Sequence, residues 1–456
     1  MHVRNPVSRL CWLLLGTLLA LTLMLNAGTT ANGEPRLSLR ESITLAFEHN
    51  LTIRLAEHDI HLAESGRDQA FGEFLPTLST LLEYIHKSEA PNIDFSPELF
   101  SALGLPSPTS LTRINLGGKE VSSLKVSLRQ PLFAGLSITN NYRRSTVSLD
   151  IAHSRLRTVQ HMLAFEVVRT FLAVLRAQKG EELSAQQVRA LEAQAAQSQA
   201  FFEEGVIPKN DLLKAEVELA NARQNFIRAH NQVELAKAHF NHTLGRDLAT
   251  PVHLQDVLEI EPLALPELSA ALQVSWQQRP ELQELMHAVE AAQLGVAVAT
   301  SQFLPNLNLV GTYTVDLVGS NPNASAERWE VGGVLQWTPF RGGKIRAQVV
   351  EAKIARLRAS DILKQRREQS ALEVKEALLN LLEAQQKIRV AQKAILQAEE
   401  NFRIAQERYR AHISTSTEVV DTEALLTQAR TNYFNAIYDE QLATFALKKA
   451  TGTILE

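Results

Sequence analysis

Two stretches of the sequence decide the fold: residues 205–245, GVIPKNDLLKAEVELANARQNFIRAHNQVELAKAHFNHTLG, and residues 412–452, HISTSTEVVDTEALLTQARTNYFNAIYDEQLATFALKKATG. They have equal lengths and correspond residue by residue at an offset of 207 positions. Each begins with a short turn, continues for about 35 residues without proline and ends in glycine. Glycine commonly follows the end of a helix, and a long proline-free run favours one. The sequence therefore predicts two long helices that each start from a turn.

A heptad repeat runs along both stretches, with a large residue at one position and a small residue three positions later. The first stretch has Leu212, Leu219, Phe226, Val233 and Phe240, with Ala215, Ala222, Ala229, Ala236 and Thr243. The second has Val419, Leu426, Tyr433, Glu440 and Leu447, with Thr422, Ala429, Ala436, Ala443 and Ala450. Small residues let helix backbones approach closely, as a wall of packed helices requires. Glu440 breaks the pattern, and a plain antiparallel coiled coil would show the same periodicity.

The correspondence continues upstream of these stretches. The offset of 207 pairs Phe133 with Phe340 and Gly135 with Gly342, whereas Phe-Leu-Pro at 74–76 matches 303–305 at an offset of 229. The first copy therefore holds 22 additional residues between Pro76 and Phe133. A fixed order of matching signals is the mark of an internal repeat. We predict two copies of one unit, over residues 32–250 and 251–456.

Within each copy the periodicity changes from helical to strand-like. Helical segments over about 38–72 and 281–302 lead into alternating sequence that predicts strands at about 77–87, 121–131, 306–316 and 328–338. Strands of about 9–11 residues that are apolar on one side suit the wall of a membrane barrel, although a soluble β-sandwich would alternate in the same way. Loops over about 88–119, which is rich in proline, and 317–327 join the strands. Proline-free helices follow over about 137–203 and 344–410, each about 100 Å long at 1.5 Å per residue.

The first 31 residues have the composition of an export signal. Arg4 and Arg9 precede an apolar run from Leu10 to Leu25, and small or polar residues follow. A permanent anchor is the alternative, but the apolar run is short for a spanning helix. Cys11, the one cysteine of the chain, lies in this segment, so we expect no disulfide and no thiolate metal site in the mature protein. The net charge of −4 and the lack of a basic tract argue against a nucleic-acid partner.

In their order, these pieces resemble the TolC-type outer membrane efflux protein family. The motifs that carry the resemblance are the two Phe-Leu-Pro strand entries, the strand exits Pro-Leu-Phe-Ala-Gly (131–135) and Pro-Phe-Arg-Gly-Gly (339–343), and the two helix-hairpin tips. The resemblance implies an α+β fold that is mostly α and a homotrimer. Its 12-stranded transmembrane β-barrel would take four strands from each chain and continue into a long periplasmic helical barrel.

The resemblance also implies a function and a location. The protein would be the outer-membrane channel of a tripartite efflux or type I secretion system in a Gram-negative bacterium. It would be a passive duct surrounded by outer-membrane lipid that receives small molecules or proteins from a periplasmic adaptor and an inner-membrane transporter. A non-porous periplasmic coiled-coil scaffold is the alternative.

Two sites follow from the resemblance. The hairpin tips, at about 204–210 and 411–417, would contact the adaptor through Gly205, Val206, Ile207, Pro208, Ala411, His412, Ile413 and Ser414. His412 stands where glycine is common, which puts the shape of the second tip in question. Glu418 and Asp421 would form the pore gate, because three residues apart they share a helix face and threefold symmetry makes them carboxylate rings. Acidic residues at a helix start also favour the helix dipole without any gate.

Other chemistry finds little support in the sequence. The sequence contains no G-x-S-x-G, H-E-x-x-H or Walker motif, so we expect neither an enzyme nor a cofactor. His58 with His61 and His239 with His242 are interpreted as surface or packing residues, a periplasmic metal-binding protein being the weaker alternative. The run 364–368 (KQRRE) is interpreted as a solvated helix face.

Overall fold

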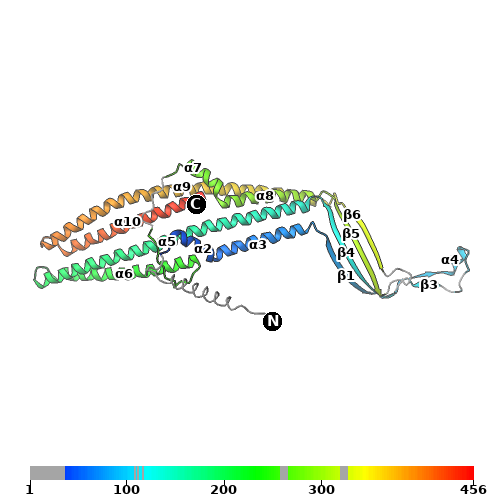
Figure 1. Cartoon of the computed structure of the whole chain (residues 1–456), viewed down its shortest axis with the longest axis horizontal. Helices are drawn as coiled ribbons and strands as arrows, with labels where there is room; N and C mark the ends of the chain where they lie inside the picture. Colours follow the sequence, from blue (N-terminus) through cyan, green and yellow to red (C-terminus); the bar gives the residue numbers. More distant parts are fainter. Residues whose placement is uncertain (1–35, 107–108, 110–111, 116–117, 257–264, 319–326) are drawn as a thin grey trace, which may run out of the picture.

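The structure is a computed structural model that describes residues 36–106, 109, 112–115, 118–256, 265–318 and 327–456. The expected export signal, residues 1–31, lies outside the described residues. The protein is elongated, with long helices at one end, shorter helices in the middle and a sheet towards the other end (Figure 1). The described part of the chain is mostly helical.

Two long helical hairpins lie side by side. In the first, α5 (Ser137–Glu203) is followed by α6 (Lys209–Leu244); in the second, α9 (Lys344–Arg410) is followed by α10 (Ser416–Thr451) (Figure 1). The first helix of each hairpin contains 67 residues and the second contains 36. Equivalent ion pairs link the arms: Arg223 to Glu192 at 2.8 Å, and Arg430 to Glu399 at 2.9 Å. The second ion pair lies 207 residues after the first, which is the offset that relates the two sequence stretches.

Paired shorter helices lie beside the half of the long helices that is nearer the sheet (Figure 1). They are α2 (Leu39–His49) with α3 (Leu51–Gly72), and α7 (Leu268–Gln278) with α8 (Pro280–Ser301). The sequence predicted one unbroken helix over about 38–72, so the break at Asn50 is a correction. In the second copy, α7 precedes the helix predicted over about 281–302. Asn50 is extended, and its side chain caps α3 through Thr52 N at 2.8 Å. Arg279 is extended because the residue before a proline is sterically excluded from the helical region.

The largest core cluster lies where α2, α5, α6 and the start of α3 meet. It includes Val167, Val168, Phe171 and Phe240, and the two aromatic rings meet edge-on at 6.0 Å. Burying such a side chain contributes about 1.5–3 kcal/mol. One stretch of α5 is long and apolar enough to cross a membrane by composition, but half of it is buried inside the protein. Its apolar character is accounted for by packing against the neighbouring helices.

Four strands form one antiparallel sheet in the order β1 (Thr77–His86), β4 (Glu120–Ala134), β5 (Asn306–Val318) and β6 (Glu327–Gln336). These bounds differ from the predicted ranges by at most three residues. Every residue of β1 and β6 is exposed. In the described part of the chain, each of these two strands pairs on one side only, so the sheet has two open edges.

The segment between β1 and β4 is more ordered than the predicted loop over 88–119. Strands β2 (Asn92–Phe95) and β3 (Thr112–Asn115) pair with each other, and α4 (Pro97–Ala102) lies between them in sequence. Proline at the first position of a helix sacrifices no hydrogen bond, which is why Pro97 starts α4 rather than preventing it. The rings of Phe95 and Phe100 pack at 6.3 Å. This small hairpin extends beyond the main sheet (Figure 1).

Two glycines fix α6 and α10, the return helices of the two hairpins, against the short helices. Gly245 ends α6 with φ 72°, and a β-carbon there would lie 2.8 Å from the carbonyl oxygen of His49. Gly452 ends α10 with φ 84°, and its β-carbon would lie 2.9 Å from the backbone nitrogen of Arg279. Both positions need glycine for its left-handed conformation and for its lack of a side chain. Each return helix therefore ends directly on the break between two short helices.

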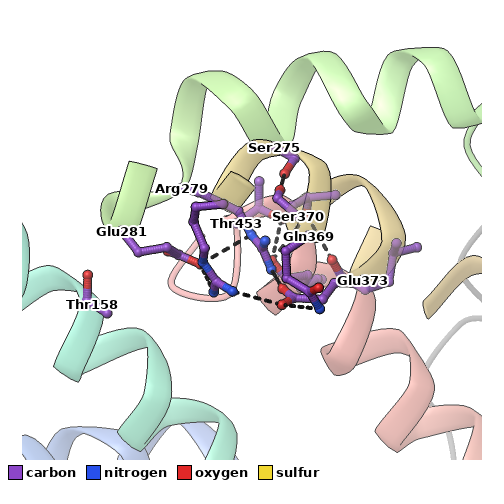
Figure 2. A network of polar contacts seen from close by, with 12 residues as sticks. Thr158, Ser275, Arg279, Glu281, Gln369, Ser370, Glu373 and Thr453 are labelled. Carbon is purple, nitrogen blue, oxygen red and sulfur yellow. Dashed lines mark hydrogen bonds and ion pairs between the residues drawn. The ribbon is translucent and has the colours of Figure 1, made fainter. Parts of the chain in front are cut away.

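A buried charge network holds the second break (Figure 2). Arg279 is 3% exposed, and its Nη2 donates to Glu373 of α9 at 2.5 Å while its Nε lies 3.4 Å from Glu281. Arg366 joins the same two carboxylates at 3.0 and 3.2 Å. The interpretation of residues 364–368 as a solvated face is therefore wrong for Arg366. Burial raises the pKa of Glu373, but the hydrogen bond and charge of Arg279, aided by Arg366, outweigh it and the net pKa is lowered.

Replacing Arg279 with methionine tests this network. Because the change leaves two carboxylates facing one remaining arginine, we expect it to destabilise the helical part by about 3 kcal/mol, the lower end for breaking a buried ion pair. Because the pKa of Glu373 is lowered in the folded protein, the ion pair with Arg279 stabilises the fold at pH values above the ordinary pKa of glutamate. This stabilisation is lost as the pH falls through the lowered pKa of Glu373. Thermal unfolding followed by circular dichroism measures both effects. Arg367→Met, at an exposed neighbouring position, is the control; equal losses in the two variants would contradict the role of Arg279.

Candidate functional site: the helix tips and the acidic pair

The first tip is the turn between α5 and α6. Gly205 has φ 73°, and Val206 N donates to Phe201 O at 2.8 Å, which closes the end of α5. Gly205, Val206 and Pro208 are exposed and Ile207 is half-buried. Pro208 is extended and immediately precedes α6, where its missing N–H has no consequence. The turn therefore presents a small apolar surface at the end of the hairpin.

The second tip has the same backbone despite the histidine. His412 has φ 61°, and Ile413 N donates to Arg408 O at 3.0 Å, the equivalent of the bond in the first tip. A left-handed conformation costs a residue with a side chain about 1–2 kcal/mol. The imidazole packs against the ring of Phe201, with centroids 4.5 Å apart, which offsets part of this cost. Ala411, His412 and Ile413 are exposed and Ser414 is half-buried, so histidine preserves the shape of the turn.

A buried polar cluster joins the two hairpins just above the tips. Ser198 of α5 meets the Tyr409 hydroxyl of α9 at 2.9 Å, and Gln194 Nε2 donates to Ser416 Oγ of α10 at 3.2 Å. All four side chains are buried. Nearby, Lys214 Nζ donates to Thr417 Oγ1 at 3.0 Å. We call Gln194, Ser198, Tyr409 and Ser416 the tip cluster.

Sequence reasoning did not identify the tip cluster, although the two copies contain a signal. At the offset of 207, Tyr409 corresponds to Phe202 and Ser416 to Lys209, so neither hydroxyl has a counterpart in the first copy. Buried polar groups must find partners, and these find them in the other hairpin. A comparison of the copies for unmatched hydroxyl groups would have pointed to these positions.

The two acidic residues of the predicted gate have different surroundings. Glu418 lies in the first turn of α10; it accepts from Arg408 Nη1 at 2.7 Å and from Ser414 Oγ at 2.5 Å. Asp421 is exposed and has no side-chain hydrogen bond or ion pair within the described chain. Glu418 is thus neutralised within its own chain, whereas Asp421 keeps an uncompensated charge.

A third acidic residue on α10 is buried. Glu423 accepts from Gln187 of α5 at 3.0 Å and from Thr427 at 2.8 Å. Burial raises the pKa of Glu423, and these hydrogen bonds oppose the shift. At 5% exposed, Glu423 connects α10 to α5 through Gln187.

The histidine pairs do not form part of this site. His58, His61, His239 and His242 are all exposed, and His61 pairs with Glu64 at 3.0 Å. Across the described residues, no three side chains of His, Cys, Asp or Glu gather where they could hold a metal ion.

These features define a class of protein: long paired helical hairpins that end in small tips and continue into an open antiparallel sheet. The model of the outer membrane efflux protein family matches residues 42–246 and 271–453, and the chain belongs to this family. It is accordingly a channel component of outer-membrane efflux or secretion, and the family consists of channel proteins.

Individual relatives agree with the family. The alkaline protease secretion protein AprF of Pseudomonas aeruginosa is 24% identical over 73% of this chain and 69% of its own length. The outer membrane protein TolC of Vibrio cholerae is 23% identical over 71% of this chain and 77% of its own length. Among solved structures, CusC superposes with a TM-score of 0.76 at 18% identity, over 93% of this chain and 95% of the other. The Campylobacter jejuni CmeC outer membrane channel superposes with a TM-score of 0.75 at 16% identity, over 94% of this chain and 91% of the other.

Replacing Tyr409 with phenylalanine tests the tip cluster. The change removes the hydroxyl that meets Ser198 and leaves the ring, so we expect the two tips to open more often, by the equivalent of about 1 kcal/mol. Hydrogen–deuterium exchange in residues 198–209 and 409–418 should accelerate. Tyr433→Phe is the matched control, because no hydrogen bond of its hydroxyl occurs within the described chain. Exchange that is unchanged in Tyr409→Phe would show that the cluster does not hold the tips.

Proposed function

We propose that three copies of this chain form the outer-membrane exit duct of a tripartite efflux or type I secretion system. The observation that carries the proposal is a sheet with two open edges beside helical hairpins of about 100 Å. Unpaired backbone groups cannot be left in lipid, where no water can bond to them. Pairing β6 of one copy with β1 of the next removes both edges, and three copies close a barrel of 12 strands.

One face of the sheet suits contact with lipid. The strand register places Leu78, Leu128, Gly311 and Val331 in one row across the sheet. The same face of β6 also carries Trp329, which is 75% exposed, and Leu335. Trp337 lies directly after the end of this strand. Aromatic residues at both ends of an apolar band are typical of the outer surface of membrane barrels. In this arrangement the helices extend into the periplasm.

The helical part also has surfaces that suit further copies. Large apolar side chains are exposed along α9, among them Ile354, Leu357, Leu379, Val390 and Leu396. Exposed apolar rows of this length commonly mark contacts with another chain. Packed side by side, three chains bring six hairpins into one tube, and we propose that the two sequence copies are its repeating structural units.

The tips are proposed to meet the periplasmic adaptor. Val206 and Ile413 are exposed at the end of each hairpin, and Gly205, Ile207, Pro208, Ala411, His412 and Ser414 complete the two turns. These small apolar surfaces lie at the end of the molecule opposite the sheet (Figure 1). The adaptor would connect the duct to an inner-membrane transporter that supplies small molecules or proteins.

The duct is tested by its assembly state. Purified from outer membranes, the chain should run as a trimer that dissociates on heating. Val331→Lys places a charge on the proposed lipid face and should destabilise the barrel by about 2–4 kcal/mol, since the strand centre is where such a charge costs most. Glu330→Lys, on the opposite face of the same strand, is the control. A soluble monomer or dimer that needs no detergent would favour a periplasmic coiled-coil scaffold instead.

The gate is proposed to depend on Asp421 more than on Glu418. In a threefold assembly each residue would form a ring, and a ring of free carboxylates favours cations. Arg408 and Ser414 compensate Glu418 within each chain, which leaves the ring of Asp421 with the uncompensated charge.

Single-channel recording in planar bilayers tests this assignment. Asp421→Ala with Glu418→Ala should raise conductance and reduce cation preference, and Asp421→Ala alone should account for most of the change in preference. Arg408→Gln should increase cation preference, because it frees the carboxylate of Glu418. Conductance and selectivity that stay at wild-type values in all of these variants would remove Glu418 and Asp421 from the gate.

A further inference from the structure

Glu440 lies in the seam of its hairpin, by which we mean the row of heptad positions that otherwise hold a large apolar or aromatic residue. Its counterpart in the first copy is Val233, which is 2% exposed in α6. Glu440 is itself only 5% exposed, on the face of α10 that packs against α9. The chain therefore places a carboxyl group inside a helical hairpin where the equivalent hairpin has a hydrocarbon side chain. Burying an unpaired carboxylate is costly, so this substitution needs a physical compensation.

Three oxygen atoms of the cluster around Glu440 are left without a partner. Glu440 Oε1, Gln441 Oε1 and Thr444 Oγ1 are all buried without a hydrogen-bond partner. Gln441 Nε2 donates to the other carboxyl oxygen, Glu440 Oε2, at 3.2 Å. Glu440 Oε1 and Gln441 Oε1 can only accept when Glu440 is ionised, and the one hydroxyl hydrogen of Thr444 can serve only one of them. The cluster is then one donor short, which a proton on Glu440 or a cation would supply.

Several charged groups of the surrounding elements are paired with one another. On α9, Lys387 binds Glu383 at 2.7 Å. Between α5 and α10, Arg176 binds Asp439. On α6, Lys237 binds Glu234 at 2.8 Å, and α7 contains no charged residue. Burial raises the pKa of Glu440, and the side chains of Thr444 and Gln385 oppose this only in part.

We propose that Glu440 is a proton-binding site inside the α9–α10 hairpin, neutral while the hairpin is packed and ionised when it loosens. A neutral carboxyl group gains an O–H donor for the oxygen atoms that lack one. A metal ion fits the position less well, because it would need several oxygen ligands and the helix carbonyls are already bonded. The proton binds more tightly to the packed form, so packing is favoured at low pH and weakens as pH rises from about 4.5 through the raised pKa of Glu440.

The experiment compares the purified full-length assembly with three variants over about pH 5 to 8. Glu440→Gln mimics the neutral acid, so it should match wild type at the acid end and become more stable than wild type as pH rises, by roughly 2–4 °C in unfolding temperature. Glu440→Val, which copies the first hairpin, should show the same trend. Glu376→Gln, at an exposed position of α9, should run parallel to wild type at every pH.

Infrared spectroscopy gives a second readout that does not depend on the variants folding well. At about pH 6 an exposed glutamate is ionised, so the carbonyl band of buried protonated carboxyl groups should be stronger in wild type and Glu376→Gln than in Glu440→Gln, where Glu423 is still present. A band of equal strength in wild type and Glu440→Gln would overturn the proposal. A difference in unfolding temperature between wild type and Glu440→Gln that is constant over pH would also overturn it. Stabilisation of wild type by sodium or potassium ions at fixed pH, lost in Glu440→Gln, would identify a resident cation in place of the proton.

Discussion

The open edges of β1 and β6 are the constraint on which the proposed assembly depends. Each edge presents a row of backbone donors and acceptors, and both edge strands are exposed along their whole length. Such a sheet cannot remain single in lipid, because every unpaired peptide group would lose its bonds to water. Pairing with other copies would satisfy the backbone groups at both edges. It would also determine how the helices are arranged around the barrel, because α5 follows β4 and α9 follows β6 through short turns. The threefold order proposed for the tips is thus set at the opposite end of the molecule.

In the proposed assembly the helical part would transmit this order, because its joints are closely packed. Gly245 and Gly452 bring each return helix against a break between short helices, where a single added carbon would collide with backbone. At one break the cap is an asparagine; at the other it is the buried Arg279, with Glu281, Arg366 and Glu373 around it. A buried ion network contributes less to net stability than its number of bonds suggests, but it tolerates few alternative arrangements. We infer that the charge network orients α7 and α8 on α9 more than it strengthens the fold.

Periodicity was sufficient to locate the long helices, the four strands of the main sheet and the two tips, because each extends over many residues with one unbroken signal. It failed where a single residue decides the outcome. Asn50 and the Arg279–Pro280 step each interrupt a helical pattern that is otherwise continuous, and Pro97 begins a helix inside what looked like a loop. Arg366 belongs to a charged run whose partners are distant in sequence, so no local pattern distinguishes it from its exposed neighbour Arg367. The tip cluster escaped prediction for the same reason.

Three differences between the two copies add a polar group to the second hairpin. Where the first hairpin has Gly205, Phe202 and Val233, the second has His412, Tyr409 and Glu440, so each change adds a polar group to the second hairpin. All three lie on α9, α10 or the turn between them, and two of them contact Phe201 of the first hairpin. An apolar seam has one stable packing, whereas a seam with buried polar groups depends on the hydrogen bonds and protons that satisfy them. If Glu440 binds a proton as proposed, the packing of the second hairpin therefore depends on pH, whereas Val233 gives the first hairpin no such dependence at the equivalent position.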